Sequence, residues 1–277
     1  MKINWLKICQ KIGKESSKAI MKVYNSGQRR KELGRGAGGD ITIEADKKSE
    51  DIVIKNLEKL NVCINLISEE RGELKCGRTS APSHLRTPFY YVIVDPLDGS
   101  FNFKNGIDHF GISIAVMDEN YNFVIGYIRN ALNGDEYYAL KGKGAFKNGK
   151  KIKTSKSDLP HHTLFEVSKK SSRADFDFII RGFLHSSHNR GLGAVVLDFA
   201  LVADGTFDSL VYAGASRFLD VAAGIFLVRE AGGLVTDFNG NEIIFKGTKL
   251  ISHNIIAAAN KKVLETFLQQ RFILGQR

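Results

Sequence analysis

Two apolar runs of this chain end abruptly in acidic side chains, and this feature constrains the fold more than any other. The run at 62–67 leads into Ser68-Glu69-Glu70, and the run at 90–94 leads into Asp95-Pro96-Leu97-Asp98. Both runs have the length and the β-branched content of buried strands. Carboxylates at the ends of such strands are expensive to desolvate unless positive charge faces them. Because these motifs contain no Lys or Arg, we expect a bound divalent cation.

Asp220 is a third acid in a comparable position, because it opens a predicted helix. Alone, Asp220 would be an ordinary helix cap, and Asp95-Pro96 an ordinary turn signal. Acids at two strand ends and at a helix start together favour a metal site over separate caps and turns. Ligands that are all oxygens favour Mg²⁺ or Mn²⁺ over Zn²⁺. The predicted metal ligands are Glu69, Asp95, the Leu97 carbonyl, Asp98 and Asp220, with Glu70 as a further candidate.

The segment after Asp98 adds a predicted anion-binding element. Gly99-Ser100 begins an expected helix through Phe103, whose free N–H groups can hold a phosphate. Metal ligands beside such a helix start suggest metal-assisted hydrolysis of a phosphate ester, with two or three ions. In this interpretation the Ser100 hydroxyl orients the attacking water, and Asp46 is the acceptor behind it.

The composition is that of a folded protein. The 277 residues are 43% hydrophobic and 25% charged, which excludes a disordered chain. No apolar stretch approaches the roughly 20 residues that span a bilayer, and no signal peptide is visible, so we expect a cytoplasmic protein without a membrane partner. The three cysteines lack CxxC spacing, which argues against a disulfide framework or a zinc ribbon.

The periodicity of apolar residues predicts two halves in an α/β fold. Residues 1–150 are expected to form an α+β half with most metal ligands, and residues 151–277 an α/β half with Asp220 and substrate-facing loops. Helices are predicted at 3–24, 47–60, 175–185, 193–203, 220–231 and 260–270. Strands are predicted at 41–43, 62–67, 90–94, 110–117, 122–130, 135–140, 163–168, 207–212, 233–236 and 255–259. Residues 34–39 and 71–88 are predicted loops.

Basic residues are concentrated in one segment. Residues 141–156 carry seven lysines and no acid, and the whole chain has a formal charge of +10. This charge permits attraction to nucleic acid, anionic lipid or phosphorylated metabolites without choosing among them. A nucleic-acid patch is one interpretation of the lysines, but Gly142, Gly144 and Asn148-Gly149 favour a solvated hairpin.

The acidic motifs resemble those of the inositol monophosphatase family of Mg²⁺-dependent, lithium-sensitive phosphatases. Residues 95–103 resemble its first signature, Asp-Pro-Ile/Leu-Asp-Gly-Thr/Ser-x-Asn-Phe, and residues 219–233 resemble its second, Trp-Asp-x-Ala-Ala-Gly…Glu-Ala-Gly-Gly. The segments 42–46, 67–70 and 142–149 are similar to other family segments. The resemblance runs collinearly over about 40–240.

The resemblance implies a five-layered αβαβα sandwich, usually a homodimer. It implies that Glu69, Asp95 and the Leu97 carbonyl bind one metal, and that Asp95, Asp98 and Asp220 bind a second. Glu69 and waters resemble a looser third site. Ser100 is similar to the residue that orients the nucleophilic water, with Asp46 behind it.

Departures from the family pattern concern the substrate. The family's Gly-Ser/Thr-Ala-Ala segment appears as Gly193-Ala194-Val195-Val196, and Ala213 stands where inositol-specific members carry Glu. Both changes weaken the case for inositol itself. Arg190, just before Gly193, is a candidate for binding the leaving group of the substrate. The leading interpretation is a Mg²⁺-dependent phosphomonoesterase for a small phosphorylated metabolite, similar to inositol-1-monophosphatase. The alternatives to it are a histidinol phosphatase, a fructose-1,6-bisphosphatase, a 3′(2′),5′-bisphosphate nucleotidase, or a binding partner of RNA or the transcription machinery.

Overall fold

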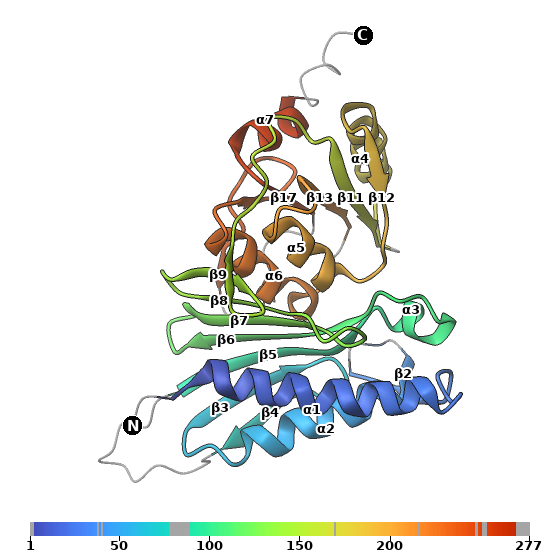
Figure 1. Cartoon of the computed structure of the whole chain (residues 1–277), viewed down its shortest axis with the longest axis vertical. Helices are drawn as coiled ribbons and strands as arrows, with labels where there is room; N and C mark the ends of the chain where they lie inside the picture. Colours follow the sequence, from blue (N-terminus) through green and yellow to red (C-terminus); the bar gives the residue numbers. More distant parts are fainter. Residues whose placement is uncertain are drawn as a thin grey trace.

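The computed structural model describes residues 3–37, 39, 41–77, 89–168, 170–214, 216–246, 249–250 and 254–269. Within these ranges two large sheets alternate with three helical layers (Figure 1). The layered αβαβα sandwich expected for this chain is thereby confirmed. None of the described helices is both long and apolar enough to cross a membrane.

The first sheet has eight strands and carries most of the predicted acidic motifs. Its order is β10 (Lys150–Ile152), β9 (Gly144–Lys147), β8 (Glu136–Leu140), β7 (Phe123–Asn130), β6 (Gly111–Asp118), β5 (Phe89–Asp98), β3 (Cys63–Ser68) and β4 (Gly72–Gly77). Neighbours pair antiparallel except β3 and β5, which run parallel. The carboxyl ends of β3 and β5 therefore meet at one edge of the sheet.

The second sheet has five strands and a mixed topology. Its order is β12 (His188–Arg190), β11 (His162–Val167), β13 (Ser209–Ala213), β17 (Ile255–Ala258) and β14 (Leu234–Thr236). β11 pairs parallel with β12 and β13, whereas β17 runs antiparallel to both of its neighbours. Two further pairs are small: β1 (Glu32–Arg35) with β2 (Ile41–Ile43), and β15 (Phe245–Lys246) with β16 (Lys249–Leu250).

Helices fill the three remaining layers (Figure 1). α1 (Trp5–Asn25) and α2 (Glu44–Leu57) cover the outer face of the first sheet, and α5 (Val195–Ala203) and α6 (Phe218–Glu230) lie between the sheets. α4 (Arg173–His185) and α7 (Lys261–Gln269) pack on the far face of the second sheet, and the short α3 (Ser100–Asn105) follows β5. One cluster of buried side chains fills the space around α5 and α6, and two others lie under the outer helices.

The lysine-rich segment forms the predicted hairpin. β9 and β10 are joined by Asn148-Gly149, and both residues have positive φ, at 50° and 79°. This is the backbone geometry that tight two-residue hairpin turns require. The proposed division of the chain at residue 150 stays a prediction.

Five short strands lie where the sequence did not predict them. The predicted loop at 71–88 is wrong for β4, which pairs with β3 along its whole length, while residues 78–88 lie outside the described residues. The predicted loop at 34–39 is wrong for its first two residues, which belong to β1. β12, β15 and β16 were also not predicted. These strands have only two to six residues, too few for a periodic apolar pattern to emerge.

Candidate metal centre

The predicted acidic side chains converge at the carboxyl edge of β3 and β5. Ser68 lies opposite Val94 in the parallel pairing, so that Glu69 and Asp95 follow side by side. A cavity of about 60 Å³ opens at this point. Its lining includes Asp46, Glu69, Glu70, Asp95, Leu97, Asp98, Gly99, Ser100 and Arg217. Segments as distant as α2 and the start of α6 therefore contribute to one small space.

Asp95 is fully buried at the centre of this cluster. Its Oδ1 accepts a hydrogen bond of 3.0 Å from the Leu97 N–H, whereas its Oδ2 is buried without a hydrogen-bond partner among the described residues. Ser49 Oγ donates to the Pro96 carbonyl at 2.8 Å and fixes the turn. Burial, and then the negative charges of Glu69 and Asp98, raise the pKa of Asp95 well above its usual range.

Asp98 connects the first sheet to the central helices. The strand pairing of β5 with β6 is irregular between Asp95 and Asp98, so that both side chains turn toward the cavity. Asp98 Oδ2 accepts a 2.8 Å hydrogen bond from the Val196 N–H in the first turn of α5. Burial and the charge of Asp220 raise the pKa of Asp98 to about 8.

Arg217 is the charged residue that the sequence analysis missed. Its Nε and Nη2 donate to the two Asp220 oxygens at 2.9 and 3.0 Å, and its Nη1 donates to Glu69. Burial alone would lower the pKa of Arg217, but the charges of Asp220 and Glu69 outweigh burial and raise it. The acidic motifs contain no Lys or Arg, but Arg217 lies just before one of them and neutralises two of the acids. The available signal was the i, i+3 spacing of Arg217 and Asp220 at a helix start.

The donor chemistry of the site suits a hard divalent cation. Every candidate ligand is an oxygen, and Asp95 Oδ2 is an unsatisfied acceptor in a fully buried carboxylate. As they stand, no three His, Cys, Asp or Glu side chains of the described residues are arranged around a common ion position. The bidentate contact of Arg217 occupies both oxygens of Asp220. A cation would therefore have to displace this guanidinium to bind Asp220.

Asp46 and Ser100 line the same cavity but do not contact each other by a hydrogen bond recorded among the described residues. Asp46 lies in the first turn of α2 and accepts a 2.8 Å hydrogen bond from the Ile43 N–H. Burial, followed by the charges of Glu70 and Glu69, raises the pKa of Asp46 well above its usual range. Ser100 is the first residue of α3, as predicted.

Glu70 belongs to this lining and is held by a neighbouring strand. Thr42 in β2 donates its hydroxyl hydrogen bond to the Glu70 carboxylate. Burial nevertheless raises the pKa of Glu70, and the charge of Glu69 acts in the same direction. Glu70 is thus a half-buried member of the cluster and not a fully solvated surface acid.

The predicted phosphate-facing residues come from two segments that touch. Gly99 has φ +81°, and a Cβ there would lie 2.8 Å from the His109 carbonyl oxygen and 2.9 Å from Ala194 Cβ. Only glycine fits this close approach of β5 to the start of α5. The Gly193 N–H donates to Glu166 Oε1 at 2.9 Å, which fixes the loop before Ala194.

Arg190 lies apart from the cavity lining. It is the last residue of β12 at the edge of the second sheet, and its Nη1 donates to the Asn189 carbonyl at 2.8 Å. It is exposed, and the carboxylate cavity does not include it. Arg217 therefore provides the guanidinium within the carboxylate cavity.

Comparison with known proteins assigns the chain to the metal-dependent phosphoric monoester hydrolases. The model of the inositol monophosphatase family matches residues 2–274, almost the whole sequence. The chain belongs to this family, as its two signatures predicted, and it is a phosphatase. A fructose-1,6-bisphosphatase/inositol-1-monophosphatase of Thermococcus kodakarensis is 36% identical over 278 residues, which cover 97% of this chain and 98% of the relative.

Solved structures show the same fold. The extragenic suppressor protein suhB from Bartonella henselae superposes with a TM-score of 0.81 at 28% identity, covering 96% of this chain and 98% of its own. An inositol monophosphatase–fructose 1,6 bisphosphatase superposes with a TM-score of 0.79 at 33% identity, covering 96% and 99%. The superposition thus covers nearly the whole length of this chain and of both solved chains.

Proposed function

We propose that this phosphatase uses Mg²⁺ to hydrolyse a small sugar or polyol phosphate. The observation that carries the proposal is the cluster of buried and partly buried carboxylates at the ends of β3 and β5. Above all, one oxygen of the fully buried Asp95 has no hydrogen-bond partner among the described residues. Such a cluster is stable only with positive charge beside it. Its oxygen ligands favour Mg²⁺, and Mn²⁺ would be a substitute.

The proposed ligands divide between two principal ion positions. Glu69, Asp95 and the Leu97 carbonyl would hold one ion, and Asp95, Asp98 and Asp220 would hold another. Glu69 and waters would hold a third ion more loosely. Bound divalent ions supply an acidified water and charge stabilisation for the leaving alkoxide. The fixed strand ends keep the ligands in place, since Asp95 is anchored by Leu97 and Asp98 by Val196.

The remaining residues of the cavity would position water and phosphate. Ser100 Oγ would orient the attacking water, with Asp46 as the acceptor behind it once substrate draws the two side chains together. The backbone at Gly99 and Ser100, together with Asp98, Gly193 and Ala194, would line the phosphate position. Gly99 permits this close approach because it carries no Cβ.

We infer that the substrate is a sugar bisphosphate and not inositol monophosphate. Ala213 and Ala194 are fully buried and offer neither the carboxylate nor the hydroxyl that would recognise a polyol. Arg217, once released from Asp220, would bring a guanidinium to the mouth of the site. A second phosphate on the substrate would match this guanidinium. The relatives named fructose-1,6-bisphosphatase/inositol-1-monophosphatase support the same choice.

A substrate panel with metal-depleted protein tests this function. We expect phosphate release to require added Mg²⁺, to be inhibited by Li⁺, and to be faster with fructose-1,6-bisphosphate than with inositol-1-phosphate, histidinol phosphate or 3′-phosphoadenosine 5′-phosphate. Hydrolysis without divalent ions would refute the metal mechanism. Faster hydrolysis of 3′-phosphoadenosine 5′-phosphate than of fructose-1,6-bisphosphate would refute the proposed substrate class. A homodimer, a cytoplasmic location and contacts with nucleic acid or the transcription machinery stay predictions.

A further inference from the structure

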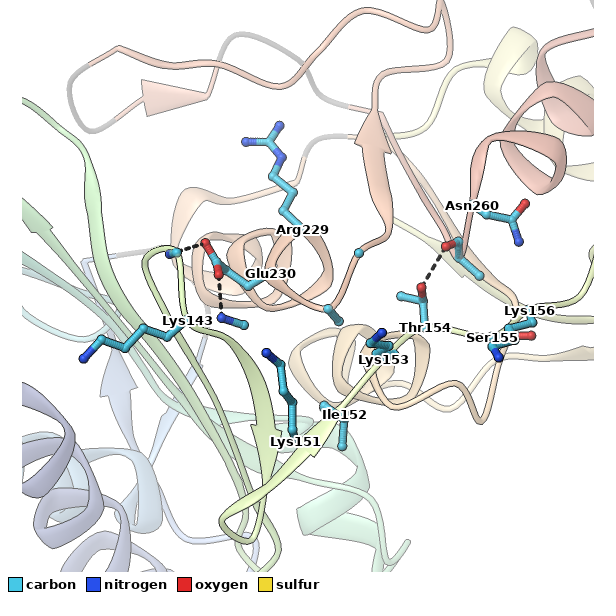
Figure 2. A pocket seen from close by; sticks show the side chains of 15 residues that line it. Lys143, Lys151, Ile152, Lys153, Thr154, Ser155, Lys156, Arg229, Glu230 and Asn260 are labelled. Atoms are coloured by element: carbon cyan, nitrogen blue, oxygen red, sulfur yellow. Dashed lines mark hydrogen bonds between the residues drawn. The ribbon is translucent and has the colours of Figure 1, made fainter.

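A second cavity, of about 740 Å³, gathers much of the lysine-rich segment (Figure 2). Lys143, Lys151, Lys153 and Lys156 line it. They come from the turn before β9, from β10 and from the chain that leaves the first sheet. The phosphatase chemistry proposed above uses none of these residues.

This cavity lies at the opposite end of α6 from the carboxylates. Its lining includes Arg229, Glu230 and Gly232 at the carboxyl end of the helix, whereas Asp220 lies in the first turn. The ten helical steps from Asp220 to Glu230 span about 15 Å. Figure 2 shows Lys151 extending from β10 toward this end of the helix, with Lys153 and Thr154 in the chain that directly follows β10. The two cavities are therefore separate sites.

The lysines of this cavity lack acidic partners. Among the described residues, none of the four has a carboxylate within the 4.0 Å of an ion pair, whereas Lys147 of the same segment lies 2.9 Å from Asp204. Glu230 is the acid in the described lining, and its two oxygens accept hydrogen bonds of 2.9 Å from the N–H groups of Gly142 and Gly144. Positive charge thus dominates the cavity.

The neutral polar groups of the lining are already engaged. Thr154 Oγ1 donates to the Ala259 carbonyl at 2.8 Å, and Ser155 Oγ donates to Asp208 at 2.6 Å. Asn260 Nδ2 donates to a main-chain carbonyl at 2.7 Å. Recognition in this cavity would therefore rest on the lysine ammonium groups. Ammonium groups bind phosphate as compact point charges without the planar geometry that a guanidinium imposes.

We propose that this cavity is a second, non-catalytic site for a small metabolite with two or more phosphate groups. Its volume is within the roughly 300–1,000 Å³ of small-ligand sites, which suits a compact polyanion. Several lysines without acidic partners favour multiple negative charges over one. The site is independent of the carboxylate cluster and of its bound ions.

Calorimetric titration of metal-depleted protein with inorganic tripolyphosphate tests the proposal. We expect the double variant Lys151→Gln/Lys153→Gln to bind at least about tenfold more weakly, while Lys141→Gln/Lys150→Gln retains the affinity of the unsubstituted protein. The control pair loses the same charge from the same segment but does not line the cavity. Inorganic phosphate should bind more weakly than tripolyphosphate.

Each other outcome would overturn the proposal. Equal losses in both double variants would show diffuse surface attraction, and no binding by the unsubstituted protein at millimolar tripolyphosphate would remove the site. Tighter binding of a single-stranded RNA decamer, lost in the cavity variant alone, would assign the lysines to nucleic acid. Mg²⁺-dependent phosphatase activity of the cavity variant should stay unchanged, so this test is independent of the proposed function.

Discussion

At the scale of single residues, the salient feature is a guanidinium where a metal ion would bind. Arg217 makes a bidentate contact with Asp220 and reaches Glu69, so it neutralises two of the proposed ligands. Cation binding and this contact are mutually exclusive at the Asp220 oxygens. Arg217 is therefore expected to stabilise the metal-free protein and to weaken the apparent metal affinity.

Replacing Arg217 by Gln should separate these two effects. We expect the variant to bind Mg²⁺ about tenfold more tightly, because Asp220 no longer has to be released, which corresponds to about 1.4 kcal/mol. Its metal-free form should melt at a lower temperature, since Asp220 and Glu69 lose their counter-ion. Calorimetry and thermal unfolding measure both. Arg190→Gln, with the same loss of charge outside the cavity, is the control, and equal effects in the two variants would contradict this account.

Asp95→Asn should nearly abolish turnover and leave the fold intact. The amide can still accept the hydrogen bond from the Leu97 N–H, but it cannot supply an anionic ligand. The metal-free variant should even melt higher, because a buried carboxylate repelled by Glu69 and Asp98 has been removed. Activity with Mg²⁺, circular dichroism and thermal unfolding check these points. Turnover near that of the unsubstituted enzyme would refute the ligand assignment.

The pair of His109 and Asp198, outside the cavity, leads to a prediction about how stability depends on pH. His109 Nε2 lies 2.9 Å from Asp198 Oδ1. Burial lowers the pKa of His109 to about 4. Burial, and then the charge of Glu166, raise the pKa of Asp198 well above its usual range. We therefore expect the folded pair to carry one proton, on Asp198. Between about pH 4 and 6.5 the unfolded pair also carries one, on the histidine, so the pair adds no pH slope to stability.

Single substitutions at His109 and Asp198 should each make the free energy of unfolding depend on pH, with opposite signs. In His109→Gln the folded state keeps the Asp198 proton that the unfolded chain releases, so the free energy of unfolding should fall as pH rises. In Asp198→Asn the unfolded histidine takes up a proton that the folded one refuses, so stability should rise with pH. Each slope is up to about 1.4 kcal/mol per pH unit. Unfolding at pH 4.5, 5.5 and 6.5, taken relative to the unsubstituted protein, measures them, and slopes of the same sign would show a charged pair.

The acidic ligands could be predicted from the sequence because each sits at the end of a recognisable element. Glu69 and Asp95 end apolar strands, and Asp220 opens a helix. Arg217 was missed although it stands three residues before its partner Asp220. The contacts of Arg217 with Glu69 and of Glu166 with the Gly193 amide could not be predicted, because these partners are distant in sequence and only tertiary folding brings them together.

At the scale of elements, the long periodic segments could be predicted and the short ones could not. α1 and α6 lie close to their predicted bounds, because helices of 21 and 13 residues are long enough to show the helical spacing of apolar residues. β4 was missed because its polar Glu73 and Lys75 alternate with only two apolar residues, Leu74 and Cys76. Its existence depends on pairing with β3, which no local pattern contains.

The contact between α5 and α6 is an element-scale feature that one methyl group can test. A Cβ on Gly224 in α6 would lie 2.4 Å from Phe199 Cγ in α5. Gly224→Ala should destabilise the protein by about 1–3 kcal/mol, because overpacking shifts rigid neighbours. Adding Phe199→Leu should restore part of this loss. Denaturant unfolding measures both, and a Gly224→Ala variant as stable as the unsubstituted protein would contradict the close packing.

At the scale of the whole molecule, the proposed metal ligands tie the two sheets together. Asp95 and Asp98 end a strand of the first sheet, whereas Asp220 begins a helix between the sheets. The layered architecture itself could be predicted through the family resemblance. The apolar patterns alone indicated its elements but not their order in the two sheets, because the parallel pairing of β3 with β5 leaves no local trace.

Ion binding should therefore stabilise the entire fold. Mg²⁺ at 100 times its dissociation constant should add about 2.7 kcal/mol to the free energy of unfolding, since the unfolded chain lacks the site. Chelation should reverse the increase in Tm, and Asp220→Asn should lose most of it. Thermal unfolding across a Mg²⁺ titration gives the measurement. A Tm indifferent to Mg²⁺ and chelator would contradict a shared ion site.

The open ends of the eight-stranded sheet have a consequence for solubility. β4 and β10 are its outer strands, and an outer strand presents unpaired N–H and C=O groups on which a second chain can add. Lys150 and Lys151 on β10 would face like charges if two copies met there. Lys151, assigned above to polyphosphate binding, and Lys150 beside it therefore also oppose fibrous association. A polyanion that neutralised Lys151 would weaken that protection.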